Sequence, residues 1–241
     1  MTNYINRQLS LRQYDMTNET YVMNGIKEAA CYATQDFAGD LERTWKGTLG
    51  EKRESYLSGG GIAKDYVLPD YQNVTEGILR DHDPGLANKK RKIAAGKAVE
   101  NPEEIMTLRC ERFNVPELLF NPMDIGLRQP GLAQIVMQSL QVLPIGLWPG
   151  MLANIVVVGG IAMIDGFIHR LQAEIMALTP AECMVRLARP IDPNPIVATW
   201  HGGANLAHDE ETISKLSVTK QEYDEYGAAW VARKFAHGAT K

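Results

Sequence analysis

Apolar residues near the N-terminal end of the chain recur with the period of an α-helix. They are Ile26, Ala30, Ala33, Phe37 and Leu41. Residues three or four positions apart share one face of a helix. The spacing therefore predicts one amphipathic helix across residues 25–45, with a single buried face.

The helical period is lost at Lys46 and does not return before about Leu108. Only residues 64–72, KDYVLPDYQ, have the composition of a β-strand. Pro69 predicts that this strand lies at a sheet edge, because proline cannot donate a ladder hydrogen bond. An irregular segment of this length is uncommon inside a compact domain. We therefore interpret residues 46–107 as an insertion.

The pattern after the insertion indicates strands and helices in alternation. ERFNVPELLF, residues 111–120, predicts a strand followed by a turn. A second amphipathic helix is predicted after Pro130-Gly131. Its expected apolar face comprises Leu132, Ile135, Val136, Ser139, Leu140 and Leu143.

The next segment has the order strand, helix, strand. Ile155–Val158 is a β-branched run that predicts a strand buried on both faces, and Gly159-Gly160 follows it. A helix that stops at Pro180 has its predicted buried face at Phe167, Leu171, Ile175 and Leu178. MVRLARP, residues 184–190, predicts the returning strand. This order indicates the α/β fold class.

A capping box predicts where the last helix begins. The Thr219 hydroxyl can accept a hydrogen bond from the first turn, while Glu222 reaches back to the N–H of the cap. The predicted helix then carries Tyr223, Tyr226, Trp230 and Val231.

Composition predicts a soluble intracellular protein. The net charge is −4 and charged residues make up 22% of the chain, so no general attraction to nucleic acid or anionic membranes is expected. Cys31, Cys110 and Cys183 are far apart, which predicts neither a disulfide framework nor a zinc site. The first ten residues are too polar for a signal peptide, and the apolar stretch 151–164 is too short to span a bilayer.

Gly159-Gly160 is the strongest candidate for a ligand site. A glycine pair after a buried strand lets backbone N–H groups approach a nucleotide, and the N-terminus of the next helix would add a favourable dipole. The alternative is a tight strand-to-helix turn without a ligand. The chain contains neither a G-x-G-x-x-G fingerprint nor a phosphate-binding P-loop sequence.

Other candidates have an ordinary structural explanation beside the functional one. Lys27-Glu28 either grips a ribose or base edge or forms a solvated surface pair. Gly202-Gly203 either admits a ligand or, as we expect, allows close packing. The five histidines and the scattered acids form no catalytic or metal-binding pattern.

A basic run offers a candidate nucleic-acid contact or nuclear-import signal. It comprises Lys89, Lys90, Arg91 and Lys92. The alternative is a solvated loop.

Five segments, in order, resemble motifs of the actin family. They are GIKEAACYATQDF (25–37), ERFNVPELLFNP (111–122), NIVVVGGIAMIDGFIHRLQAEIMALTP (154–180), TWHGGANLA (199–207) and VTKQEYDEYG (218–227). Together they extend over nearly the whole chain outside the insertion. The resemblance implies an α/β, actin-like fold of the kind shared with heat-shock chaperones and sugar kinases. It also implies that only the C-terminal half of that fold is present, without the N-terminal half.

The resemblance implies three regions. Residues 1–112 would be similar to subdomain 4, with the insertion at about 46–107. Residues 113–195 would form the α/β core of subdomain 3, and residues 196–241 would return to subdomain 1. This last segment would expose Tyr223, Trp230 and Phe235 where the family packs it on the N-terminal half.

The resemblance also implies a vestigial nucleotide site. It would place five residues around an adenine nucleotide, namely Lys27, Glu28, Gly159, Gly160 and Met163. Ile164 and Ile196 depart from the family, which has an aromatic residue and a lysine at these positions. ATP or ADP is therefore expected only in a full-length chain, and no cofactor is certain for this one.

Two further segments are similar to a nuclear branch of the family, namely DYVLPDY (65–71) and residues 109–140. This branch supplies a subunit of SWR-type chromatin-remodelling complexes, which replace a core nucleosomal histone with its variant form. The resemblance implies a non-catalytic role, other remodeller subunits as partners, indirect contact with histones or the nucleosome, and no membrane partner. The expected location is the nucleus, with a cytoplasmic pool.

Two classes of enzyme and one of binding protein remain as alternatives. An ATP-hydrolysing or sugar-kinase member of the actin-like superfamily would need a phosphate loop and catalytic acids. A dinucleotide-binding enzyme would need the missing G-x-G-x-x-G turn. The third alternative is an actin-like ATP-binding or cytoskeletal protein.

Overall fold

The computed structural model describes residues 1–45, 61–71, 75–82, 103–188 and 194–236. The α-helices are α1 (Thr2–Ser10), α2 (Thr20–Ala30), α3 (Phe37–Trp45), α6 (Glu111–Glu117), α7 (Leu132–Gln141), α8 (Trp148–Leu152), α9 (Phe167–Leu178), α10 (Ala198–His208), α11 (Glu210–Leu216) and α12 (Lys220–Ala236). The strands are β1 (Lys64–Val67), β2 (Ile78–Asp81), β3 (Ile105–Leu108), β4 (Ile155–Val156) and β5 (Leu187–Ala188). The 3₁₀-helices are η1 (Pro122–Ile125), η2 (Ile145–Leu147) and η3 (Gly160–Met163).

The chain divides into two compact units. The large unit comprises Met1–Ile155 and Met163–Leu187, and the small unit comprises Val156–Ala162 and Ala188–Lys241. Helices and strands are mixed along the chain, as expected for a partial actin-like α/β fold. The predicted division at residues 112 and 195 stays a prediction.

The large unit contains an antiparallel sheet with the strand order β2-β1-β3. Tyr66 on β1 lies opposite Leu79 on one side and Met106 on the other. The predicted edge position of this strand is therefore wrong. Pro69 lies beyond the end of β1, so its missing N–H costs the ladder nothing. The described parts of the predicted insertion thus contribute regular strands.

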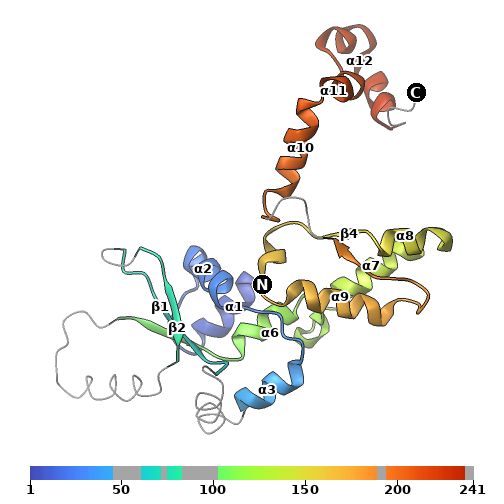
Figure 1. Ribbon diagram of the computed structural model, residues 1–241. Coiled ribbons are helices and arrows are strands. Elements are labelled where there is room, and N and C mark those ends of the chain that lie inside the picture. The colour runs from blue at the N-terminus through green and yellow to red at the C-terminus, as the bar shows by residue number, and fades with distance from the viewer. Residues whose placement is uncertain (46–60, 72–74, 83–102, 189–193, 237–241) are drawn as a thin grey trace, which may run out of the picture. The chain divides into compact units, whose positions relative to one another are not determined.

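Two helices cover this sheet and form the main core. Figure 1 shows α1 and α2 beside the strands. Fully buried members of the cluster are Ile5, Leu9, Met23, Ile26, Met106, Leu108 and Val115. On α2 they recur three or four residues apart, which explains why this part of the helical pattern was readable in the sequence.

The predicted helix across residues 25–45 is wrong, because the chain forms two helices there. Cys31 is extended (φ −80°, ψ 144°) and ends α2. The next two N–H groups leave the helical path: Tyr32 donates to the Arg112 carbonyl (3.0 Å) and Ala33 to the Asp165 carbonyl (2.7 Å). Asp36 then accepts from the Gly39 N–H and starts α3. These long-range backbone hydrogen bonds break the helix that the local sequence pattern predicts.

Residues 111–120 also differ from the prediction. The segment forms helix α6 rather than a strand. Glu111, Phe113, Val115, Pro116 and Glu117 are all buried. A short helix that is buried on most sides has no single apolar stripe, so its pattern resembles that of a strand.

Helices α7 and α9 form where they were predicted, but their predicted buried faces are confirmed only in part. The two helices pack against each other (Figure 1). α9 buries Phe167, Leu171 and Ile175 as expected, whereas Leu178 is 47% exposed. The buried face of α7 comprises Ala133, Met137 and Leu140, so only Leu140 of its predicted face is confirmed. Ile135 and Leu143 are 45% and 37% exposed. The apolar face of α7 is thus wider than its packed face.

The predicted strands around α9 are shorter than expected. β4 contains only two residues, and Val156 and Val158 are about half exposed, so burial on both faces is wrong. β5 contains Leu187 and Ala188, while residues 189 and 190 of the predicted strand lie outside the described part of the chain.

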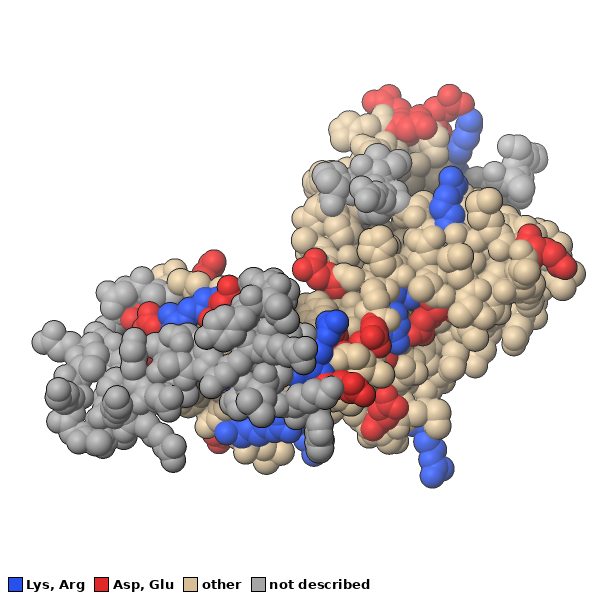
Figure 2. All heavy atoms as spheres, turned by 60° about the horizontal axis from the view of Figure 1, so that its bottom comes forward, with Lys and Arg blue, Asp and Glu red and all other residues tan. Residues whose placement is uncertain are grey.

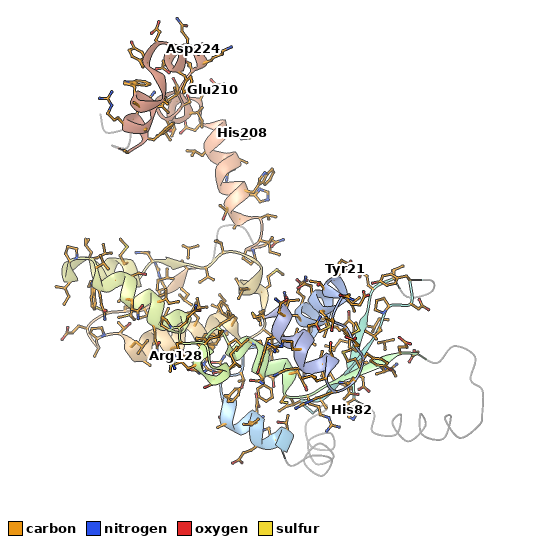
Figure 3. The ribbon with its side chains drawn as sticks, turned by 180° about the vertical axis from the view of Figure 1, so that it is seen from behind. Tyr21, His82, Arg128, His208, Glu210 and Asp224 are labelled. Carbon is orange, nitrogen blue, oxygen red and sulfur yellow. The ribbon has the colours of Figure 1, made fainter. Side chains whose placement is uncertain are left out.

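The small unit carries the last three helices. His208 ends α10, Glu210 begins α11, and Asp224 lies on α12 (Figure 3). The predicted capping box at Thr219 is confirmed: its N–H donates to Glu222 Oε2 (2.8 Å) and its hydroxyl accepts from the Glu222 N–H (3.2 Å). Tyr223 and Phe235 are 50% and 58% exposed, as expected for this segment, whereas Trp230 is half-buried.

A long stretch of the chain carries no Asp, Glu, Lys or Arg. It begins after Arg128 (Figure 3) and ends before Asp165. Within it Val142 is 85% exposed and Ile145 is 76% exposed. Figure 2 shows broad areas of surface without charged side chains, beside places where acidic and basic side chains lie close together. No helix in the described ranges is both long and apolar enough to cross a bilayer.

A buried ion pair joins α9 to α6. The Arg170 guanidinium donates to Glu117 Oε1 (3.0 Å), to Glu174 Oε1 (2.6 Å) and to the Thr34 carbonyl (2.7 Å). The side chains of Arg170 and Glu117 are only 13% and 5% exposed. A charge buried to this extent is tolerated because its hydrogen bonds and the opposite charge of Glu117 offset the cost of removing it from water.

Removal of this cation should destabilise the protein. We expect Arg170→Met to lower the free energy of unfolding by about 3 kcal/mol, because Glu117 would keep a buried charge without its ion partner. The matched control Lys215→Met removes a pair whose side chains are 66% and 81% exposed, and should change stability by less than about 0.5 kcal/mol. Urea denaturation would measure both, and equal effects would contradict the prediction.

Two glycines should respond oppositely to alanine. Gly166, which precedes α9, has φ +76°, and an added Cβ would lie 2.2 Å from the Ala33 carbonyl oxygen. Gly166→Ala should therefore cost about 2 kcal/mol or more. Gly202 lies inside α10 with nothing within 4 Å of an added Cβ, so Gly202→Ala should gain about 0.5–1 kcal/mol. Thermal unfolding of the two variants would reveal the opposite signs.

Candidate functional site

Lys27 is held by the neighbouring helix. Its ammonium donates to Asn24 Oδ1 (3.1 Å) and to Thr2 Oγ1 (3.3 Å), and the Thr2 hydroxyl also donates to Asn24 (2.8 Å). The residue lies in the last turn of α2, where a cation is favoured by the helix dipole. A contact with a nucleotide would therefore compete with contacts that Lys27 already makes.

Glu28 points to a different surface. It is exposed and lines a hollow of about 660 Å³ beside α2 and the β1–β2 connection. Lys27 is not among the lining residues, because neighbouring residues on a helix point about 100° apart. The structure thus assigns the two members of the predicted pair to separate environments.

Gly159 and Gly160 form an open turn in the small unit. Gly159 has φ +99°, which favours glycine, and its N–H donates to the Pro195 carbonyl (2.8 Å). Gly160 begins η3, and an added Cβ at either glycine would meet nothing within 4 Å. The backbone here is accessible, but one of its N–H groups is already bonded.

The helix that was expected to aim its dipole at this turn begins later. α9 starts at Phe167, after η3, and its N-terminus lies against the segment that joins α2 to α3. Gln35 Nε2 donates to the Gly166 carbonyl (3.0 Å), and Tyr32 forms a parallel bridge with Asp165. The predicted contribution of the α9 dipole to the glycine turn stays a prediction, because α9 and the turn belong to different units.

The two units divide the predicted nucleotide residues between them. Lys27, Glu28 and Met163 belong to the large unit, whereas Gly159 and Gly160 belong to the small unit. Met163 is 59% exposed. A shared nucleotide crevice stays a prediction. The basic run Lys89–Lys92 lies outside the described residues.

The second glycine pair does not show the close packing that we expected. Gly202 and Gly203 lie in the middle of α10, and no atom lies within 4 Å of an added Cβ at either position. Trp200, on the same helix, is 69% exposed.

The sequence pattern did not single out Arg112, which contacts three residues from other segments in the structure. Arg112 Nε donates to the Ala30 carbonyl (2.9 Å), Nη1 donates to the Ile62 carbonyl, and the guanidinium lies 5.0 Å from the centre of the Tyr32 ring. Burial lowers the pKa of Arg112, while Tyr32 and Cys31 act in the opposite direction. The segment around Arg112 also carries Glu111, Asn114 and Glu117, so no local signal distinguished this arginine.

Burial also raises the pKa of two weakly acidic side chains next to Arg112, the Cys31 thiol and the Tyr32 hydroxyl. Burial raises the pKa of Cys31 from its ordinary value of 9.0 to about 12, although Arg112 and Lys27 lower it in part. The pKa of Tyr32 is raised as well, first by burial and then by the Asp40 carboxylate, to which its hydroxyl donates (3.1 Å). Both groups therefore stay protonated and neutral near pH 7. The Tyr32 hydroxyl donates to Asp40, and the Cys31 side chain packs in the core.

Cys31 should resist alkylation in the folded chain. Because the thiolate is the reactive form, a pKa of about 12 predicts that iodoacetamide at pH 8 modifies the half-buried Cys183 well before Cys31. Mass spectrometry of timed samples, with and without urea, would measure the order. Equal rates in the folded protein would contradict the prediction.

The same shift predicts weaker folding in alkali. Above pH 9 the unfolded thiol loses its proton while the folded thiol keeps it, so the free energy of unfolding falls between about pH 9 and pH 12. Below pH 9 this contribution is fully present. The Cys31→Ala variant should lack this part of the pH dependence.

Comparison with known proteins agrees with the five motifs. The family model described as Actin matches residues 3–236. Actin-related protein 6 of Neurospora crassa is 61% identical over 238 residues, which is 99% of this chain and 52% of that protein. Actin-like protein arp6 of Aspergillus fumigatus is 48% identical over 238 residues (98% and 50%), and actin-related protein 6 of Drosophila melanogaster is 34% identical over 227 residues (94% and 51%).

The matches cover different shares of this chain and of its relatives. The chain spans about half the length of the curated relatives it matches, whereas they cover nearly all of it. The expected similarity to one branch of actin-related proteins is confirmed. Since the family model extends over nearly the whole chain, the chain belongs to the actin family.

Proposed function

We propose that the chain is part of a non-catalytic actin-related subunit of an SWR-type chromatin-remodelling complex. In this role it supports the exchange of a core nucleosomal histone for its variant form, and hence transcriptional regulation. The observation that carries the proposal is the 61% identity, over 99% of the chain, to a protein called actin-related protein 6. The partners would be the other remodeller subunits, with histones or the nucleosome contacted indirectly. The location would be the nucleus, with a cytoplasmic pool.

The contacts of the predicted nucleotide residues support a structural role. Lys27 is bonded to Thr2 and Asn24, and Glu28 lines a separate hollow. Phosphoryl transfer requires preorganised donors around the phosphates and metal. A subunit that acts through its surface has no such requirement.

The apolar surface of the large unit supports a role in assembly. Val142, Ile145 and Leu147 are 85%, 76% and 50% exposed, within the stretch that carries no charge. Exposed apolar side chains without charged neighbours in the sequence favour protein–protein contact over nucleic-acid binding.

Affinity purification of a tagged chain from its own cells would test the proposal. We expect remodeller subunits and the variant histone to be recovered, and deletion of the gene to reduce variant histone in chromatin. A Lys27→Ala variant should restore histone exchange as well as the unaltered chain does, since the proposed role needs no nucleotide contact. Recovery of cytoskeletal proteins alone would favour an actin-like cytoskeletal role instead.

A further inference from the structure

Three tyrosines and two glutamates meet in the hollow beside α2. The aromatic members are Tyr21, Tyr66 and Tyr71, and the acidic members are Glu28 and Glu76. The volume is about 660 Å³, and its described lining includes no lysine, arginine or histidine. The hollow is therefore aromatic and carries only negative charge.

Tyr66 forms the fixed wall of this hollow. It lies on the central strand β1 and is only 4% exposed. Two glycines leave room for its ring: an added Cβ would lie 3.3 Å from the Tyr66 hydroxyl at Gly25, and 2.1 Å from it at Gly77. The close approach at Gly77 explains why no side chain fills this position. The ring is thus held between α2 and β2.

The other two rings are free to contact a ligand. Tyr21 lies in the first turn of α2 and is 78% exposed (Figure 3), and Tyr71 is 59% exposed. Tyr71 has φ +56°, a conformation that is rare for a residue other than glycine. Strained backbone of this kind is concentrated at ligand-binding sites.

The groups of the hollow are close enough to influence each other. The pKa of Tyr66 is raised, first by burial and then by Tyr71, Glu76 and Tyr21. Negative charge on any of these groups therefore opposes further negative charge at the hollow. A cation in the hollow would offset the negative charge of Glu28 and Glu76, whereas a phosphate would add to it.

We propose that this tyrosine-lined hollow binds a cationic side chain, a lysine or methylated lysine, presented by a partner protein. The faces of tyrosine rings attract cations, and a few such rings around an ammonium group form an aromatic cage. Glu28 and Glu76 add an opposite charge at the rim of the hollow. The inference does not depend on the proposed role in chromatin.

A matched pair of small probes isolates the charge of the ligand. Choline and 3,3-dimethyl-1-butanol have nearly the same shape, but only choline carries a positive charge. Titration of the 241-residue chain, followed by proton NMR of the probe methyl groups, should show binding of choline and at least several-fold weaker binding of the neutral alcohol. Equal binding of the two probes, or binding of neither, would overturn the proposal.

Variants assign the binding to this hollow. Tyr21→Ala and Tyr71→Ala should each weaken choline binding by about 2- to 5-fold, because each removes one exposed ring. Tyr71→Phe should retain it, and Tyr223→Ala on α12, a similarly exposed tyrosine outside the hollow, should have no effect. Both alanine positions are exposed, so folding should be preserved, as circular dichroism would verify. Unchanged affinity in both alanine variants would place the binding elsewhere and contradict the assignment.

A peptide probe tests whether the hollow binds a methylated lysine side chain. A short peptide with one trimethyllysine should bind more tightly than the same peptide with the neutral tert-butyl isostere of that side chain. The difference should disappear in the Tyr21→Ala/Tyr71→Ala double variant. A preference for the neutral peptide would exclude a cation site.

Discussion

The large unit depends on one guanidinium that joins three distant parts of the chain. Arg112 bonds to the carbonyl at the end of α2, to the carbonyl of Ile62 before β1, and stacks on Tyr32, while its own carbonyl accepts the Tyr32 N–H. A planar group with five donors can satisfy several carbonyls at once, which a lysine could not do. The break between α2 and α3 follows from these bonds. Arg170 likewise joins α9 to the segment at Thr34, because its guanidinium donates to the Thr34 carbonyl.

Local signals allowed part of this fold to be predicted from the sequence. The capping box at Thr219, the α9 face and the α2 portion of the first helix depend on neighbours three or four residues apart, and the structure confirms them. The break at Cys31 and the helix at 111–117 depend on partners more than 80 residues away. Such partners are invisible to a periodic pattern, because tertiary hydrogen bonds outweigh intrinsic propensity.

The candidate sites divide in the same way. The open turn at Gly159 was predictable, since a glycine pair after a β-branched run is a local signal. The tyrosine-lined hollow was not, because Tyr21, Tyr66 and Tyr71 come from three segments that only the fold brings together. The separate surroundings of Lys27 and Glu28 likewise follow from the way α2 packs on α1.

The stretch without charges has a consequence for handling and assembly. Exposed side chains such as Val142 and Ile145 offer no fixed charge for small ions to screen. Contacts made through them should withstand high concentrations of sodium chloride. They should strengthen in sulfate and weaken in the cold, because sulfate increases and cooling decreases the stabilisation gained from burying apolar surface. Buffers chosen to disrupt ionic complexes would thus leave such contacts intact.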